Sequence, residues 1–74
     1  MKNLEYYIAL GYRFEILATG YSVWHKTTFV GGSSILNPVE KYKRMHWRTR
    51  IANVEDNKRS AMSIAECHFE EHVA

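Results

Sequence analysis

The residues whose types could do chemistry gather in the last third of the chain. Within residues 54–73, VEDNKRSAMSIAECHFEEHV, a cysteine and two histidines follow acids, bases and an apolar run. His68 and His72 are four residues apart, so on a helix their imidazoles would lie on one side and could share a zinc ion. A further ligand would come from His25, His46 or Glu71. Cys67 would lie about 100 degrees around the helix from His68, where it could not easily bind the same ion.

This metal interpretation has little other support in the sequence. The chain contains no Cys-x-x-Cys pair and no second His-x-x-x-His pair. The alternative is that His68 and His72 flank an apolar stripe and shield it from water. We therefore expect no metal site and no cofactor.

Catalysis has equally little support. Cys67 and His68 are adjacent, and adjacent residues of a helix point apart rather than toward each other. The acids of the same segment fall on its expected exposed side, where carboxylates are normally just solvated. The run Gly31-Gly32-Ser33-Ser34 lacks the lysine and the following helix of a phosphate-binding loop, so we interpret it as a turn. A sheet covered by one helix seldom encloses a reaction pocket, and we expect a protein that is not an enzyme.

A second group of residues is basic and aromatic. Five of the ten lysines and arginines fall within residues 41–50. Tryptophan, tyrosine and arginine dominate the binding energy at protein interfaces. The predicted partner-binding residues, called the 41–50 set below, are Lys41, Tyr42, Lys43, Arg44, Trp47, Arg48 and Arg50. Tyr7 and Trp24 are further candidates for the surface, although Trp24 and Trp47 could instead fill the core.

Two kinds of partner fit the 41–50 set. In the first, the set docks on a host protein or on a ribonucleoprotein complex. In the second, its basic side chains and His46 contact nucleic acid, with Tyr42 and Trp47 stacking on unpaired bases. The formal charge of only +2 and the eight acids weigh against nucleic acid. The sequence therefore favours a protein partner.

The elements that position these residues must fit into one small domain, 1–74. The chain has 74 residues, of which 46% are hydrophobic and 14% aromatic, a composition typical of a folded protein rather than a disordered one. Its single cysteine allows no internal disulfide, and no apolar run is long enough to span a bilayer. We expect a cytoplasmic protein with no membrane contact. Free sheet edges would allow either a monomer or a homodimer.

The first half of the chain predicts two antiparallel strands. Apolar and aromatic residues occupy the even positions of 4–16, which favours a strand over about 5–17, bent at Gly11. A competing interpretation makes 4–10 a short helix, with Asn3 as its N-cap and Gly11 as its end. Thr19-Gly20 then forms a turn, and residues 21–30 form the second strand.

The second half predicts a third strand and a helix. Asn37-Pro38-Val39-Glu40 is typical of a helix start. In residues 44–51 apolar side chains alternate with basic ones, which indicates a strand, although a helix remains the alternative there. The C-terminal helix is expected over 55–72, capped by Asn53 or Asp56. Its apolar stripe would consist of Ala61, Met62, Ala65, Phe69 and Val73. The predicted fold is thus α+β: a small antiparallel sheet of about three strands packed against one C-terminal helix.

The strand YSVWHK and the helix EDNKRSAMSIAECHFEEHV together resemble a group of small proteins of tailed phages and prophages, in which a twisted antiparallel sheet precedes one helix. The matching positions are Glu55, Asp56, Lys58, Ala61, Met62, Phe69, Glu70 and Val73. Asn57 and Ser60 depart from the group, which has alanine there. The resemblance implies a phage gene and a ββ(β)α fold but no chemistry. Because small phage proteins without catalytic residues usually occlude a surface, we expect an inhibitor of a host defence system such as CRISPR-Cas.

Overall fold

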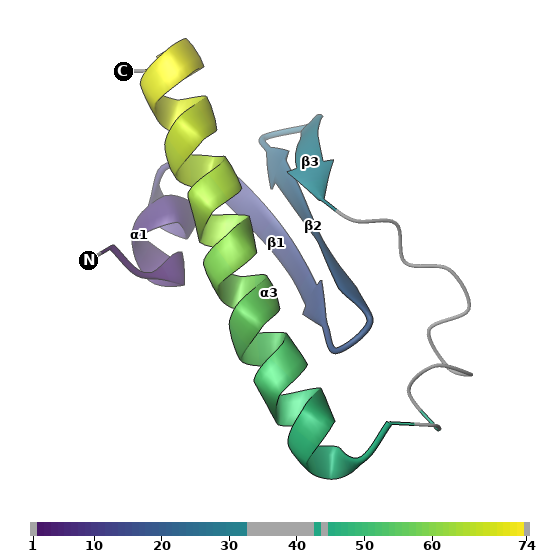
Figure 1. Ribbon diagram of the computed structural model, residues 1–74. Coiled ribbons are helices and arrows are strands. Elements are labelled where there is room, and N and C mark those ends of the chain that lie inside the picture. The colour runs from purple at the N-terminus through teal and green to yellow at the C-terminus, as the bar shows by residue number, and fades with distance from the viewer. Residues whose placement is uncertain (1, 33–42, 44, 74) are drawn as a thin grey trace.

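The structure, a computed structural model, describes residues 2–32, 43 and 45–73. Its elements are α1 (Leu4–Ala9), β1 (Tyr12–Leu17), β2 (Gly20–His25), β3 (Thr28–Gly32), α3 (Trp47–His68) and the π-helical turn η1 (Phe69–Val73). The strands form one antiparallel sheet in the order β1-β2-β3, and α3 crosses one face of it (Figure 1). This confirms the predicted fold class. The predicted helix start at 37–40 lies outside the described residues.

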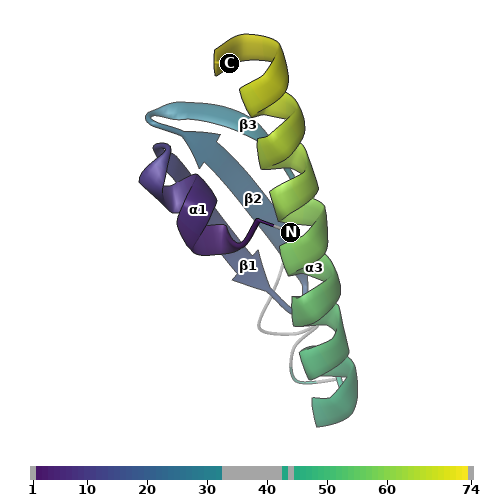
Figure 2. The same ribbon diagram turned by 90° about the vertical axis from the view of Figure 1, so that its left-hand side faces the viewer.

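The first element is the short helix α1, so the competing interpretation of residues 4–10 is the correct one. Asn3 is the N-cap, and its side-chain oxygen accepts a hydrogen bond from the backbone N–H of Tyr6 at 3.0 Å. Gly11 ends the helical turn with a φ of 97°, and its N–H donates to the carbonyl of Ile8 at 3.0 Å. The prediction of a strand from residue 5 was therefore wrong. Figure 2 shows α1 in front of the sheet and beside α3.

In β1 the period-two pattern is confirmed. Tyr12, Phe14 and Ile16 face the core, whereas Arg13 and Glu15 are exposed on the other face. A turn at residues 18–19 leads into β2, where Gly20 pairs with Leu17 and Val23 with Phe14.

The predicted single strand over 21–30 was wrong, because this segment contains a second hairpin. β2 ends at His25 and β3 begins at Thr28. Lys26 makes the reversal with a φ of 57°, and its N–H donates to the carbonyl of Gly11 at 2.8 Å. Gly31 and Gly32 lie within β3, so they were wrongly predicted to form a turn. Ser33 and Ser34 lie outside the described residues.

The longest element, α3, begins at Trp47, eight residues earlier than expected. Its N-cap is His46, whose Nδ1 accepts a hydrogen bond from the N–H of Arg48 at 3.2 Å. Asn53 and Asp56 therefore lie inside the helix and are not its caps. The strand predicted over 44–51 was also wrong: residues 47–51 are helical, and Arg44 lies outside the described residues. The helix predicted over 55–72 is confirmed within α3 and η1.

The core lies between α3 and the sheet, and small side chains let the two come close. Ala61 and Ala65 of α3 and Val23 of β2 are fully buried between the two layers. A side chain on Gly31 would reach Ile64 of α3 at 3.5 Å. The core cluster consists of Tyr7, Tyr12, Val23, Ala61 and Ala65, with Met62 and Phe69 packed at its border. Val73 is exposed, so its assignment to the buried stripe was wrong.

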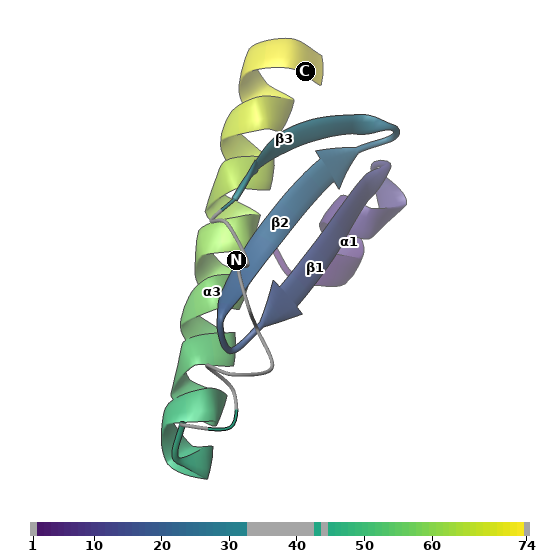
Figure 3. The ribbon, with the colours of Figure 1, turned by 90° about the vertical axis from the view of Figure 1, so that its right-hand side faces the viewer.

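One polar contact ties α3 to the far end of the β1–β2 hairpin. The Asn57 side chain donates to the backbone carbonyl of Leu17, the last residue of β1, at 2.6 Å. An alanine at position 57 could not make this bond. N-terminal to this contact, the first turns of α3 extend past the end of the hairpin, as Figures 1 and 3 both show.

Candidate partner-binding surface

The overhanging start of α3 carries two large apolar side chains that the sheet does not cover. Trp47 is 57% exposed and Ile51 is 58% exposed. They are four residues apart on the helix, so they lie on the same side of it. This pair is an apolar surface at one end of the molecule. We call it the Trp47 surface.

Two neighbouring side chains hold the indole of Trp47. The guanidinium of Arg48 lies 5.2 Å from the centre of the Trp47 ring, a cation–π distance. The centre of the His46 ring is 5.7 Å from the centre of the Trp47 ring. The exposed indole is therefore supported by its own helix turn and by the N-cap residue, which lowers the entropy that a partner would have to remove on binding.

Arg50 has a different environment from Arg48. Its Nε donates to the backbone carbonyl of Met45 at 3.0 Å, and the residue is half-buried. Asn53 approaches the Met45 sulfur at 3.7 Å. Arg50 thus helps to hold the residues that precede α3. It also borders a shallow groove of about 270 Å³, which is lined by Arg50, Ile51, Val54 and Glu55.

The structure brings together only part of the predicted 41–50 set. Trp47 and Arg48 are adjacent and exposed, and Lys43 is exposed as well. Lys41, Tyr42 and Arg44 lie outside the described residues. Ile51 belongs to the Trp47 surface, but the sequence analysis missed it because a strand would have turned it inward. The spacing of four residues between Trp47 and Ile51 would have indicated that the two share one side of a helix.

The two further aromatic candidates have different outcomes. Tyr7 is buried at 3% exposure, so its proposed surface role was wrong. Trp24 lies on the sheet face turned away from α3, where the Arg13 guanidinium is 4.7 Å from its ring centre. The Phe29 ring meets Trp24 edge-on at 5.8 Å. This second aromatic group lies on the sheet, whereas the Trp47 surface is on the overhang of α3.

The other end of α3 holds the histidines considered as metal ligands. The ring centres of His68 and His72 are 4.9 Å apart, and those of His68 and His25 are 5.1 Å apart. Nevertheless, no group of three or more histidine, cysteine or acidic side chains within the described ranges is arranged to hold a metal ion. His46 lies at the opposite end of α3, so it cannot join the other histidines.

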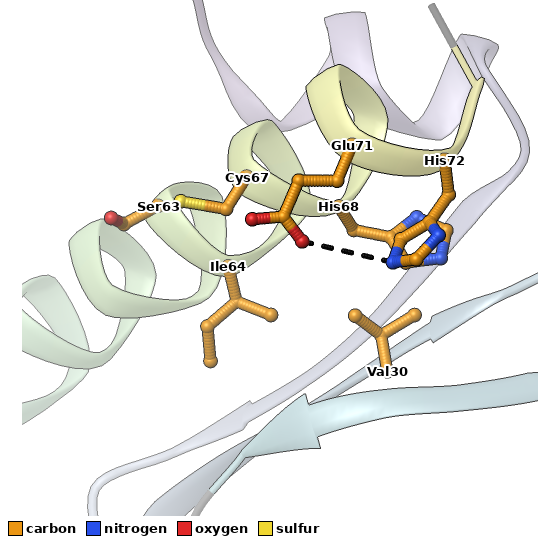
Figure 4. Close-up of a pocket in the computed structure, with 7 residues that line it drawn as sticks. All are labelled: Val30, Ser63, Ile64, Cys67, His68, Glu71 and His72. Carbon is orange, nitrogen blue, oxygen red and sulfur yellow. Dashed lines mark ion pairs between the residues drawn. The ribbon is translucent and has the colours of Figure 1, made fainter.

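A shallow pocket of about 290 Å³ opens beside these histidines (Figure 4). It is lined by Val30, Ser63, Ile64, Cys67, His68, Glu71 and His72. The sulfur of Cys67 points toward Ser63 and away from the His68 ring (Figure 4). The two side chains are therefore not arranged as a thiol–imidazole pair.

In the parts of the chain that the structure describes, no helix combines the length and the apolar character that crossing a membrane requires.

Comparison with known proteins adds no further assignment. No family model, no curated protein and no solved structure matches this chain.

Proposed function

We propose that this protein is a small phage-encoded binding protein that covers a functional surface of a host protein or ribonucleoprotein complex. The observation that carries the proposal is the exposed pair of Trp47 and Ile51 on the overhang of α3. A helix that presents an aromatic and an aliphatic side chain four residues apart has the spacing used by helices that dock into protein grooves. Tryptophan and arginine are also the commonest anchors of such interfaces.

The charges around the Trp47 surface suggest the chemistry of the partner. Arg48 lies over the Trp47 ring and is exposed, so the complementary surface would be acidic, with an apolar pocket for the indole. Nucleases carry clusters of carboxylates that hold their metal ions, and a cationic helix end could cover such a cluster. This supports, together with the resemblance to phage proteins, a role as an inhibitor of a host defence system such as CRISPR-Cas.

A nucleic-acid partner is the second candidate. Trp47 could stack on an unpaired base while Arg48 and Lys43 contact phosphates. Glu55 and Asp56, however, are exposed on the next turns of α3. Lys58 and Arg59 pair with these two acids, so this stretch of the helix has no net positive charge that could continue a phosphate-binding surface, which makes a protein partner the better fit.

The test combines a functional assay with two matched variants. In bacteria protected by a single CRISPR-Cas system, expression of the protein should restore plaque formation by a targeted phage. Arg48→Glu and Trp47→Ala should each weaken the effect by about tenfold or more, because both remove a central anchor. Lys26→Glu makes the same charge change as Arg48→Glu at an exposed hairpin residue, and it should retain full activity.

Binding measurements distinguish the two kinds of partner. Capture from a nuclease-treated lysate should persist for a protein partner, and its affinity should fall only modestly with salt, because salt screens the few charge pairs but not the apolar anchor. Capture that disappears with nuclease, or an affinity that falls steeply with log salt, would show that nucleic acid is the partner. If both variants bind like the unmodified protein, the Trp47 surface has no role. If no defence system is relieved, the proposal of an inhibitor fails.

A further inference from the structure

The end of α3 opposite the Trp47 surface holds a contact between three imidazoles from three elements. His25 ends β2, His68 ends α3 and His72 belongs to η1. Their ring centres form a chain with steps of 5.1 Å and 4.9 Å, with His68 in the middle. Such a contact joins the sheet to the last turns of the helix.

Each of the three rings has a polar partner. The Nε2 of His25 donates to the backbone carbonyl of Leu10 at 3.3 Å, which attaches it to the α1–β1 turn. Nδ1 of His68 lies 2.7 Å from the hydroxyl of Tyr12 in β1. The carboxylate of Glu71 is 3.7 Å from Nε2 of His72 at the exposed side (Figure 4). Among the residues that the structure describes, Glu71 is the only acid whose carboxylate lies within 4.0 Å of one of these imidazoles.

We propose that the His25–His68–His72 contact is an acid-sensitive latch, which holds the last turn of α3 and η1 against the sheet at neutral pH and releases them when the imidazoles become protonated. The reason is electrostatic. Neighbouring imidazolium rings at this spacing repel each other, and the half-buried position of His68 leaves its charge less fully hydrated than in water. After release, His25 on the sheet and His68 and His72 on the detached segment would each be hydrated separately.

The Tyr12 hydroxyl gives the latch its preference for the neutral state. Burial raises the pKa of Tyr12, so its O–H remains a proton donor throughout the relevant range. The Nδ1 of a neutral His68 accepts a hydrogen bond from this O–H. A protonated His68 has donors on both nitrogens and no acceptor, so the hydroxyl would have to rotate away and accept instead.

The direction of the pKa shift agrees with this geometry. Burial lowers the pKa of His68, and the positive charges of His72 and His25 lower it further, while Glu71 opposes them. The detached segment therefore binds protons more tightly than the docked one. The latch is at full strength above the ordinary histidine pKa of about 6.5, and it weakens as the pH falls below that value.

Release would expose one part of the core and spare the rest. Phe69 follows His68 directly and packs at the border of the core cluster, so it would become accessible. Tyr12 would also lose its cover from His68, with which it makes an edge-on ring contact at 5.6 Å. The Trp47 surface is at the other end of α3, so the latch is independent of the proposed partner binding.

The test is an NMR titration of the full chain from pH 8 to pH 5. Amide resonances of residues 66–73 should move toward disordered positions together with the titration of the His68 ring, while those of β1 and β2 away from the contact stay folded. In His68→Gln, these amides should show no transition over the same range. In His72→Gln, which removes one repelling charge and keeps His68, the midpoint should move down by about half a pH unit.

The control is His46→Asn, which removes a histidine outside the contact and should leave the midpoint unchanged. If residues 66–73 keep helical shifts to pH 5, there is no latch. If His68→Gln shows the same transition as the unmodified protein, the acid sensitivity arises elsewhere and the proposal is wrong.

Discussion

Gly32 at the end of β3 occupies a position where a side chain would strain the backbone and clash with β2. Its φ is 141°, a conformation that residues with a side chain rarely adopt, and a Cβ there would collide with the backbone carbonyl of Tyr21. The adjacent Gly31 is different. A Cβ at Gly31 would meet Ile64 at an ordinary contact distance of 3.5 Å.

We expect Gly32→Ala to lower the free energy of unfolding by about 2 kcal/mol or more, because backbone strain and a clash with a main-chain atom combine. Gly31→Ala adds the same methyl group to the same strand and should change stability by less than about 1 kcal/mol. Urea unfolding followed by circular dichroism measures both. Equal losses in the two variants would contradict this assignment of strain to Gly32.

His46 shows how a single side chain sets where an element begins. Its imidazole accepts the bond from Arg48 that a serine or asparagine usually accepts at a helix N-cap. The backbone carbonyl of His46 also accepts the first helical bond, from the N–H of Arg50 at 3.0 Å. Because histidine is not among the preferred caps, the sequence did not reveal this helix start.

Replacing this cap by a better one should stabilise α3. We expect His46→Asn to raise the free energy of unfolding by about 0.5–1 kcal/mol, whereas His46→Ala, which has no acceptor, should lower it by a similar amount. Thermal unfolding of the two variants gives the comparison. A lower melting temperature for the asparagine variant would show that the imidazole acts through its contact with Trp47 rather than as a cap.

The elements that could be predicted from sequence are those with enough residues to show a period. The stripe around Ala61 and Ala65 spans several turns, so the helix there was predictable. Residues 4–9 form too few turns to display one, and the chance alternation of apolar residues outweighed the cap at Asn3. Residues 44–51 were ambiguous for the same reason. The turn at Lys26 was missed because it uses neither glycine, proline nor asparagine.

In the molecule as a whole, stability depends on how closely α3 approaches the sheet. Gly31 of β3 lies next to Ile64 of α3, and Ala61 and Ala65 are completely buried between the two layers. Such a contact has no room for larger side chains, since protein interiors are packed as densely as organic crystals. The low number of large core residues makes the domain sensitive to any separation of its two layers.

Ala65→Leu should therefore lower the free energy of unfolding by about 1–3 kcal/mol through overpacking. Ala52→Leu is the matched control, because Ala52 is exposed on the overhang of the same helix, and it should be close to neutral. Denaturant midpoints of the two variants report the difference. A stable Ala65→Leu protein would mean that α3 can shift on the sheet without cost.

For the candidate site, the sequence could predict which residue types gather near residue 47 but not how their side chains are arranged. The clustering of arginine and tryptophan near residue 47 pointed to the end of the molecule at which Trp47 and Ile51 are exposed. It could not show that Arg50 turns back to Met45 while Arg48 covers an indole, because both depend on the helix phase. Nor could it show that His25 meets His68, since that contact requires the β2–β3 reversal.

The chain has two tryptophans, and the fold gives them separate surroundings: Trp24 is half-buried beside Arg13 and Phe29 on the sheet, whereas Trp47 is mostly exposed at the start of α3. Their fluorescence should consequently contain a blue component that iodide quenches poorly and a red component that it quenches readily. Replacing either indole by phenylalanine would isolate the other as an optical probe. Engagement at the overhang could then be followed in real time, without a dye, by the loss of the quenchable component alone.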